Sequence, residues 1–160
     1  MDYYLVLFFC FAITLHNIEE AIWLPKWSQQ SSKFQKPVTS SEFYFAVIFI
    51  TVLAYLSAFC FLYMPESDLA KWIFIGFLGS MIFNAIFPHL IATVIMKKYA
   101  PGLLTGLLLN VPINSLIIYQ MFLKNLIIWK DLVISTFVVG IILLVLIPLL
   151  FKFGGKITPS

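Results

Sequence analysis

The sequence contains no arginine, and only 11% of its 160 residues are charged, whereas a soluble domain has about 25% charged residues. The cationic side chains are all lysines, and they are scattered between apolar runs instead of gathered into a basic patch. We therefore expect no nucleic-acid partner. The two cysteines, Cys10 and Cys60, fall inside apolar runs, so the sequence offers no disulfide framework.

Long apolar runs dominate what remains: 62% of the residues are hydrophobic and the mean hydropathy is +1.02. A helix needs about 20 apolar residues to cross a bilayer core. This length predicts an all-α integral membrane bundle of about five transmembrane helices, which forms one domain over residues 1–160. The predicted spans are about 3–24, 43–64, 69–96, 101–123 and 131–152. Residues 25–42 are predicted to form the one long polar connection, with a short interfacial helix or a lid.

The lysines also predict an orientation, because cytoplasmic loops carry an excess of positive charge. One side of the predicted bundle holds Lys26, Lys33, Lys36, Lys97, Lys98, Lys152 and Lys156. The other side holds Lys71, Lys124 and Lys130. This excess places the N-terminus outside and the C-terminus in the cytoplasm. The lack of arginine, with abundant Ile, Phe and Asn, resembles the coding bias of an AT-rich genome and favours a bacterial cell membrane.

The first predicted span contains the unusual stretch His16-Asn17-Ile18-Glu19-Glu20. A charged side chain at the centre of a bilayer costs at least about 2.5–3.5 kcal/mol on insertion scales. On a helix, Glu19 and Glu20 follow His16 by three and four residues, so the three side chains share one face. Ionisable groups within a span are usually functional, and we expect these to form the centre of a site.

Other polar residues should lie in the same leaflet as this stretch. Alternating helix directions bring Asn84 and His89 of the third span to that depth, together with the start of the fourth span. Small or polar residues recur every four positions on these two spans, which allows close helix approach: Gly76, Ser80 and Asn84, then Gly102, Gly106, Asn110 and Asn114. We predict a polar pocket enclosed by the first, third and fourth helices, with the fifth helix as a scaffold.

Three motifs in order are similar to those of the HXXEE-domain family of small integral membrane proteins. They are His16-Asn17-Ile18-Glu19-Glu20, then Asn84-Ala85 followed by His89, then Pro101-Gly102 with Thr105. The resemblance covers roughly residues 10–115 and implies the fold and the site rather than a reaction. One departure is that His89 follows Asn84 by five residues, whereas the family pattern has four. The extra residue beside Pro88 suggests a wide turn or π-bulge, which could restore the direction of His89.

Two imidazoles and two carboxylates are a ligand set that suits Zn²⁺, Fe²⁺ or Mn²⁺. We predict that His16, Glu20 and His89 bind the metal ion, with one position left for water. Glu19 would be the general base, by analogy with the glutamate of H-E-x-x-H zinc proteases. Asn84, Thr105 and Asn110 are expected to hydrogen-bond the ligands or to contact substrate.

These residues favour a metal-dependent membrane enzyme, with a hydrolase as the leading hypothesis. Its substrate would be a lipid or another membrane-embedded molecule, reached from the cytoplasmic side. Metal-free alternatives stay open at this point: a proton- or ion-coupled transporter, a permease subunit, or a membrane interaction protein whose polar network only fixes helix packing.

Overall fold

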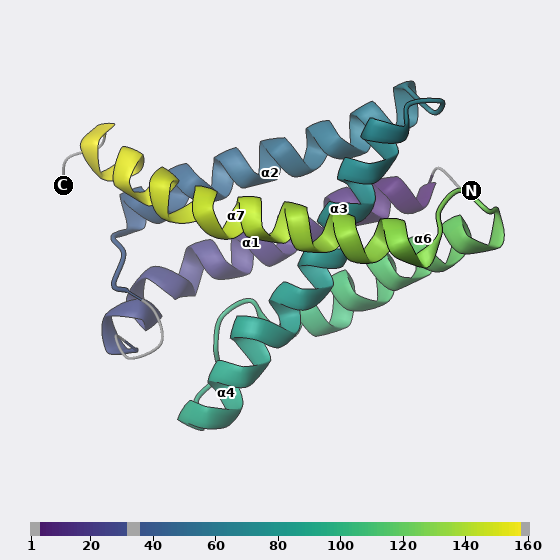
Figure 1. Cartoon of the computed structure of the whole chain (residues 1–160). Helices are drawn as coiled ribbons and strands as arrows, with labels where there is room; N and C mark the ends of the chain where they lie inside the picture. Colours follow the sequence, from purple (N-terminus) through teal and green to yellow (C-terminus); the bar gives the residue numbers. More distant parts are fainter. Residues whose placement is uncertain (1–3, 32–35, 158–160) are drawn as a thin grey trace.

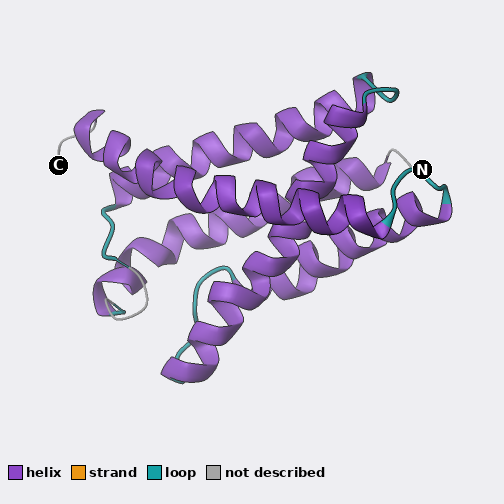
Figure 2. Cartoon of the chain, viewed as in Figure 1, coloured by secondary structure: helices purple, strands orange, loops and turns teal. Residues whose placement is uncertain are grey.

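The computed structural model describes residues 4–31 and 36–157, and Figure 2 shows helices joined by short loops, with no strand in these two segments. Five helical spans are long and apolar enough to cross a membrane: Tyr4–Gln30, Ser40–Tyr63, Asp68–Met96, Leu103–Leu123 and Trp129–Ile157. The predicted all-α membrane bundle is therefore confirmed. The start of the first span and the end of the last lie at opposite ends of the bundle in Figure 1, as five crossings require. Three residues used for the predicted boundaries and orientation, Tyr3, Lys33 and Ser160, lie outside the described segments.

The first helix, α1 (Tyr4–Gln30), is longer than predicted, so the polar stretch 25–42 is not one connection. Pro25 lies inside α1 and has no N–H to donate to the preceding turn. The helix nevertheless continues to Gln30, with Leu24 and Ser28 buried, and the next helix is α2 (Ser40–Tyr63). The Ser28 hydroxyl accepts a hydrogen bond from the Val38 amide at 3.1 Å. Thr39 and Glu42 then form a capping box that starts α2.

The third span is broken where the sequence predicts a wide turn. Helix α3 (Asp68–Asn84) passes into η1 (Ala85–Leu90), and α4 (Ile91–Met96) completes the span. Phe87 has extended backbone angles, φ −125° and ψ 117°, and the Phe87–Pro88 peptide bond is cis. The break redirects the chain, so that α4 leans away from the rest of the bundle in Figure 1. His89, just after the break, is buried.

The fourth span consists of α5 (Leu103–Thr105), η2 (Gly106–Asn110) and α6 (Val111–Leu123), and the fifth is α7 (Trp129–Ile157). Helix α7 packs mainly against α3 and α2. The core between the spans is apolar, with Phe74 of α3 stacked on Phe61 and meeting Phe9 edge-on. Many large apolar side chains remain exposed on the outer surface, as expected for helices that face lipid.

The predicted stripe of Gly76, Ser80 and Asn84 does not face one pocket. A Cβ atom added at Gly76 would lie 2.8 Å from the Ser135 carbonyl oxygen of α7, and the Ser80 hydroxyl lies 3.3 Å from the Thr136 carbonyl. Only Asn84 reaches the histidines. The reason is geometric, because residues four apart are rotated by about 40° around a helix. Over eight residues the stripe therefore turns from α7 toward α1.

Candidate functional site

The structure brings His16, Glu20 and His89 together beside the middle of α1. His16 and Glu20 lie one turn apart on α1, and the break in the third span turns His89 toward them. One ligand atom from each residue lies within 4.8 Å of the other two. Glu20 Oε1 is 3.0 Å from His89 Nε2 and 3.7 Å from His16 Nε2. Both histidines are at least 97% buried, since their exposed fractions are 1% and 3%.

Asn84 lies between the two imidazoles. Its Nδ2 atom is 3.1 Å from Nε2 of His16 and 3.1 Å from Nε2 of His89. An amide NH₂ group has two hydrogens and can donate one to each ring. His89 Nε2 can either accept from Asn84 or donate to Glu20 Oε1, depending on which ring nitrogen carries the proton. Three potential ligand atoms therefore converge next to Asn84.

Glu19 faces away from this space, toward the turn that leads into the fourth span. Its carboxylate accepts hydrogen bonds from the backbone amides of Gly102, at 2.8 Å, and Thr105, at 3.0 Å. It also accepts from the hydroxyls of Thr105, at 2.6 Å, and Tyr99. The two amides are free for this purpose because α5 begins at Leu103, and the first amides of a helix have no partner within it. Glu19 thus fixes the 99–105 turn to α1.

Tyr99 lies in the turn between the third and fourth spans, where it bonds to Glu19. Burial and this hydrogen bond to a carboxylate raise the pKa of Tyr99 to about 12. The hydroxyl also accepts a hydrogen bond from the Leu104 amide at 3.1 Å, which has the smaller and opposite effect on its pKa. Tyr99 therefore stays a neutral donor to Glu19 at physiological pH.

Thr105 links Glu19 to His16 and determines where the His16 ring carries its proton. The single hydroxyl hydrogen of Thr105 is donated to Glu19, and the same oxygen lies 3.2 Å from His16 Nδ1. That oxygen can only accept from the ring, so we infer that the proton of neutral His16 is on Nδ1. Its Nε2 lone pair then points toward Glu20 and His89. Hydrogen bonds of this kind orient ligand histidines in known metal sites.

Gly102 packs directly against the side chains of His89, His16 and Glu20. Its backbone has φ +90°, a conformation that favours glycine. A Cβ atom at this position would lie 2.7 Å from Cε1 of His89, 3.0 Å from Cε1 of His16 and 3.1 Å from Cγ of Glu20. A Cβ atom at Gly106 would lie 3.0 Å from Cβ of Ala85 and 3.7 Å from Cε1 of His16. Glycine at position 102 is thus required both by the turn and by the histidines beneath it.

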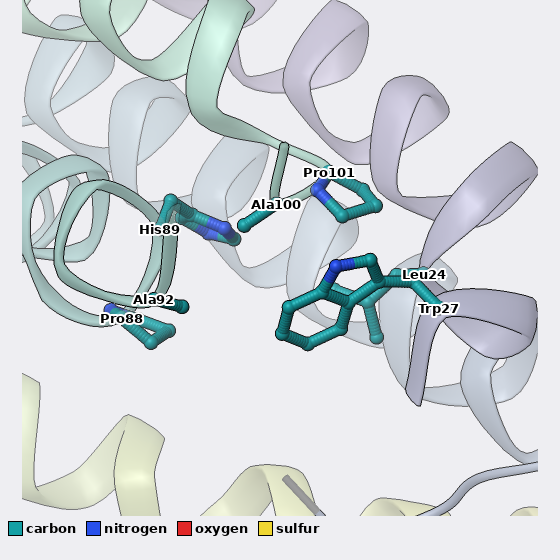
Figure 3. Close-up of a pocket in the computed structure, with 7 residues that line it drawn as sticks. All are labelled: Leu24, Trp27, Pro88, His89, Ala92, Ala100 and Pro101. Carbon is teal, nitrogen blue, oxygen red and sulfur yellow. The ribbon is translucent and has the colours of Figure 1, made fainter. Parts of the chain in front are cut away.

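A small cavity of about 20 Å³ lies beside His89, and Figure 3 shows the Trp27 ring facing it across from Pro88 and His89. This volume is sufficient for one water molecule. The indole Nε1 of Trp27 is buried and has no hydrogen-bond partner among the described residues. In Figure 3 this nitrogen is on the edge of the ring nearest Ala100 and Pro101.

Asn110 lies outside this group. Both amide atoms of its fully buried side chain lack a hydrogen-bond partner in the described segments, as does Oδ1 of Asn114 one turn further. Asn84 and Thr105, in contrast, lie within hydrogen-bond distance of the imidazole nitrogens. The sequence assigned no part in this site to Tyr99 or Trp27. The signal for Tyr99 was its place in the turn directly before Pro101-Gly102.

The fold and the geometry define a membrane protein with five helical spans and a buried His/Glu cluster between them. The chain belongs to a family described as proteins of unknown function with an HXXEE motif, whose model matches residues 7–117. It is also similar to the uncharacterized protein YrkK of Bacillus subtilis (strain 168), with 85% identity over 156 residues. That match covers 98% of this chain and 99% of the relative. No solved structure matches the chain significantly.

Proposed function

We propose that this protein is a metal-dependent membrane hydrolase whose metal ion is held by His16, Glu20 and His89. The observation that carries the proposal is the contact of Glu20 Oε1 with His89 Nε2 at 3.0 Å, while Asn84 lies 3.1 Å from the same nitrogen. Together with His16 Nε2, these atoms bring three potential metal ligands within 4.8 Å of one another. Two imidazole nitrogens and a carboxylate oxygen at this range can share a proton carried on His89 or hold a metal ion.

The donor set fits a divalent metal ion. Imidazole nitrogens and a carboxylate oxygen suit Zn²⁺, Fe²⁺ or Mn²⁺, and catalytic zinc sites use three protein ligands with one position open. The fixed tautomer of His16 leaves its Nε2 free as a ligand. Asn84 can accommodate an ion by releasing its two hydrogen bonds to the rings. These features favour a metal ion over a proton.

A divalent ion at this site would polarise a substrate oxygen and lower the pKa of a water molecule for hydrolysis. The residues of the chain prepare the site for this chemistry. Thr105 orients His16, and Asn84 holds both rings. Glu19 accepts four hydrogen bonds from the 99–105 turn, so its carboxylate oxygens are already engaged. Its predicted role as general base stays a prediction, and the geometry favours a role in positioning His16 through Thr105.

The position of the cluster within an apolar helical span supports a substrate that is embedded in the membrane. We infer that this membrane is a bacterial cell membrane. His16 and Glu20 lie near the middle of α1 (Tyr4–Gln30), and the later part of this helix carries Lys26 on the lysine-rich side of the bundle. The excess of lysines there favours a cytoplasmic location for this end and for the C-terminus. The similarity to a Bacillus subtilis protein supports a bacterial origin. Labelling Gln29→Cys in intact cells tests the orientation, since a membrane-impermeant thiol reagent should not reach it from outside.

The central experiment is elemental analysis of the purified protein, followed by assay of lipid hydrolysis in detergent. We expect about one metal ion per chain in the wild type, and loss of the ion in His16→Ala, Glu20→Gln and His89→Ala. Glu66→Gln is the matched control, because Glu66 is exposed at the opposite end of the bundle. A wild type purified with no stoichiometric metal, and unable to bind added Zn²⁺, Fe²⁺ or Mn²⁺, would falsify the proposal.

The second candidate function is proton-coupled transport, which the same short contact supports if a proton bridges Glu20 and His89. The two functions require different conditions. A hydrolase forms product in detergent with no gradient, whereas a transporter requires sealed vesicles. Flux that depends on a pH gradient, without product formation, would select the transporter.

A further inference from the structure

An open groove of about 730 Å³ runs along the outside of α1 next to the His/Glu cluster. Its volume is in the range of about 300–1,000 Å³ that is typical of small-molecule sites. The groove extends from Leu15 to Gln30, which corresponds to about 22 Å of helix. A groove of this length fits an extended chain better than a compact solute.

The groove changes in polarity along its length. The part toward the membrane centre is lined by Leu15, Ile18 and Leu104, which are each about half exposed on the outer surface. The part toward the membrane face is lined by Lys26 and Gln30. An amphiphile lying in the bilayer has the same gradient, with its tail toward the midplane and its head group at the surface.

The charges at the groove favour an anionic head group. The described lining contains two charged side chains, Lys26 and Glu19. Glu19 is only 6% exposed and already accepts four hydrogen bonds, so its charge is directed into the protein. Lys26 is exposed and free to meet a phosphate at the membrane surface. A molecule bound at the Lys26 end of the groove would therefore meet a positive charge.

The groove and the cavity beside His89 are neighbours. Trp27 and Pro101 line both of them, so these two side chains form the wall between the groove and the cluster. From the length, the polarity and the charge together, we infer that the groove binds an anionic phospholipid, with its tail along Leu15–Ile22 and its head group at Lys26. This inference rests on the proposed function only where it identifies the bound lipid as the substrate class.

The test uses the full chain in nanodiscs of equimolar phosphatidylglycerol and phosphatidylcholine, released into mild detergent for native mass spectrometry. We expect the wild type to retain one phosphatidylglycerol molecule preferentially. Leu104→Trp fills the groove and should lose the lipid, while Leu144→Trp, on the exposed outer surface of α7, should keep it. Ile18→Trp repeats the test at a second position, and size-exclusion chromatography verifies that each variant is folded.

A pair of lysine variants tests the head group. Lys26→Gln should lower the ratio of phosphatidylglycerol to phosphatidylcholine about fivefold, which corresponds to the roughly 1 kcal/mol that one lysine near the membrane surface contributes toward anionic lipid. Lys152→Gln removes an exposed lysine outside the groove lining and should leave the ratio unchanged. Equal ratios in the two variants, or a lipid retained by both groove-filling variants, would overturn the inference.

Metal content measured on the same preparations separates this inference from the proposed function. Lipid retention without bound metal would overturn the metal-dependent hydrolase and leave the lipid site standing. Bound metal without a retained phospholipid would overturn the lipid site and leave the metal-dependent hydrolase standing. If both are present, hydrolysis of phosphatidylglycerol by the wild type, and its loss in Leu104→Trp but not in Leu144→Trp, would identify the bound lipid as substrate.

Discussion

Glu19 and Glu20 are neighbours in the sequence, yet they serve two different regions of the buried polar group. Around Glu19, the anchoring region, two backbone amides and two hydroxyls from the 99–105 turn satisfy the carboxylate. Around Glu20, the ligand region, the nearest polar atoms are the ring nitrogens of His16 and His89. The first region is complete without any added group. The second brings two imidazole nitrogens and a carboxylate oxygen together in a buried space.

The difference follows from the position of each carboxylate on α1. Successive residues on a helix are separated by about 100°, so adjacent side chains cannot face the same neighbour. Glu19 faces the start of α5, where unpaired amides are available. Glu20 faces the end of α3 and η1, where the amides are used within the helix and side chains must provide the contacts. One pair of glutamates therefore both fixes the turn and leaves a binding site beside it.

Gly102→Ala should have the largest effect, because Gly102 belongs to both regions. Its amide bonds to Glu19, and an added Cβ would collide with His89 at 2.7 Å. A positive φ and overpacking together should cost about 2–4 kcal/mol of unfolding free energy, measured by denaturation in detergent. Gly140→Ala is the matched control, since its Cβ would meet only Ser80 Oγ at an ordinary 3.5 Å. Equal stability of both variants would contradict the geometry of the turn.

The next largest effect should separate the two carboxylates directly. Glu20→Gln replaces an anionic ligand by a neutral amide and should weaken metal binding by more than about 100-fold, because even a substitution outside the ligand shell costs about 10–100-fold. Glu19→Gln should keep the metal at stoichiometric levels in elemental analysis. It should instead lower the unfolding free energy, since the Gly102 and Thr105 amides lose a charged acceptor. Equal metal loss in both variants would mean that both carboxylates are ligands.

Thr105→Val should have a smaller effect that links the regions. Valine keeps the shape of the side chain but removes the oxygen between His16 and Glu19, so the His16 ring loses its fixed orientation. We expect metal affinity to fall by about 10–100-fold in a competition titration with a chelator. Thr136→Val, at a buried hydroxyl with no hydrogen-bond partner in the described segments, should leave the affinity unchanged. If Thr105→Val binds the metal ion as tightly as the wild type does, the orientation of His16 does not depend on its link to Glu19.

Much of this arrangement could be predicted from the sequence. Apolar run lengths gave the five spans, and helical spacing with alternating directions brought His16, Glu20, Asn84 and His89 to one depth. The path of the third span after Pro88 was predicted only as a wide turn, because the backbone angles at Phe87 depend on packing against neighbouring helices. The role of Tyr99 depends on a turn whose direction no periodic pattern encodes.

Spacing was least reliable where it was used to assign faces. The Gly76–Ser80–Asn84 stripe drifts around α3, so two of its members pack against α7. Asn110 continues the repeat of Gly102 and Gly106, yet no hydrogen bond joins its amide to the described members of the cluster. Four-residue spacing places side chains on related faces, but the partner of each face is determined by how the helices cross.

The smallest expected effect is in the titration of Tyr99, which reports on the anchoring region alone. The difference in tyrosinate absorbance between the wild type and Tyr99→Phe should have its midpoint near pH 12, above the ordinary value of 10. Because the folded-state pKa is the raised one, the contribution of this hydrogen bond to stability is present below pH 10 and is lost as the pH rises through 12. Glu19→Gln should lower the midpoint only part of the way toward 10, since burial is the larger cause and remains. Glu20→Gln and Glu66→Gln should leave it unchanged, and a shift in Glu20→Gln as large as that in Glu19→Gln would show that the two regions act as one.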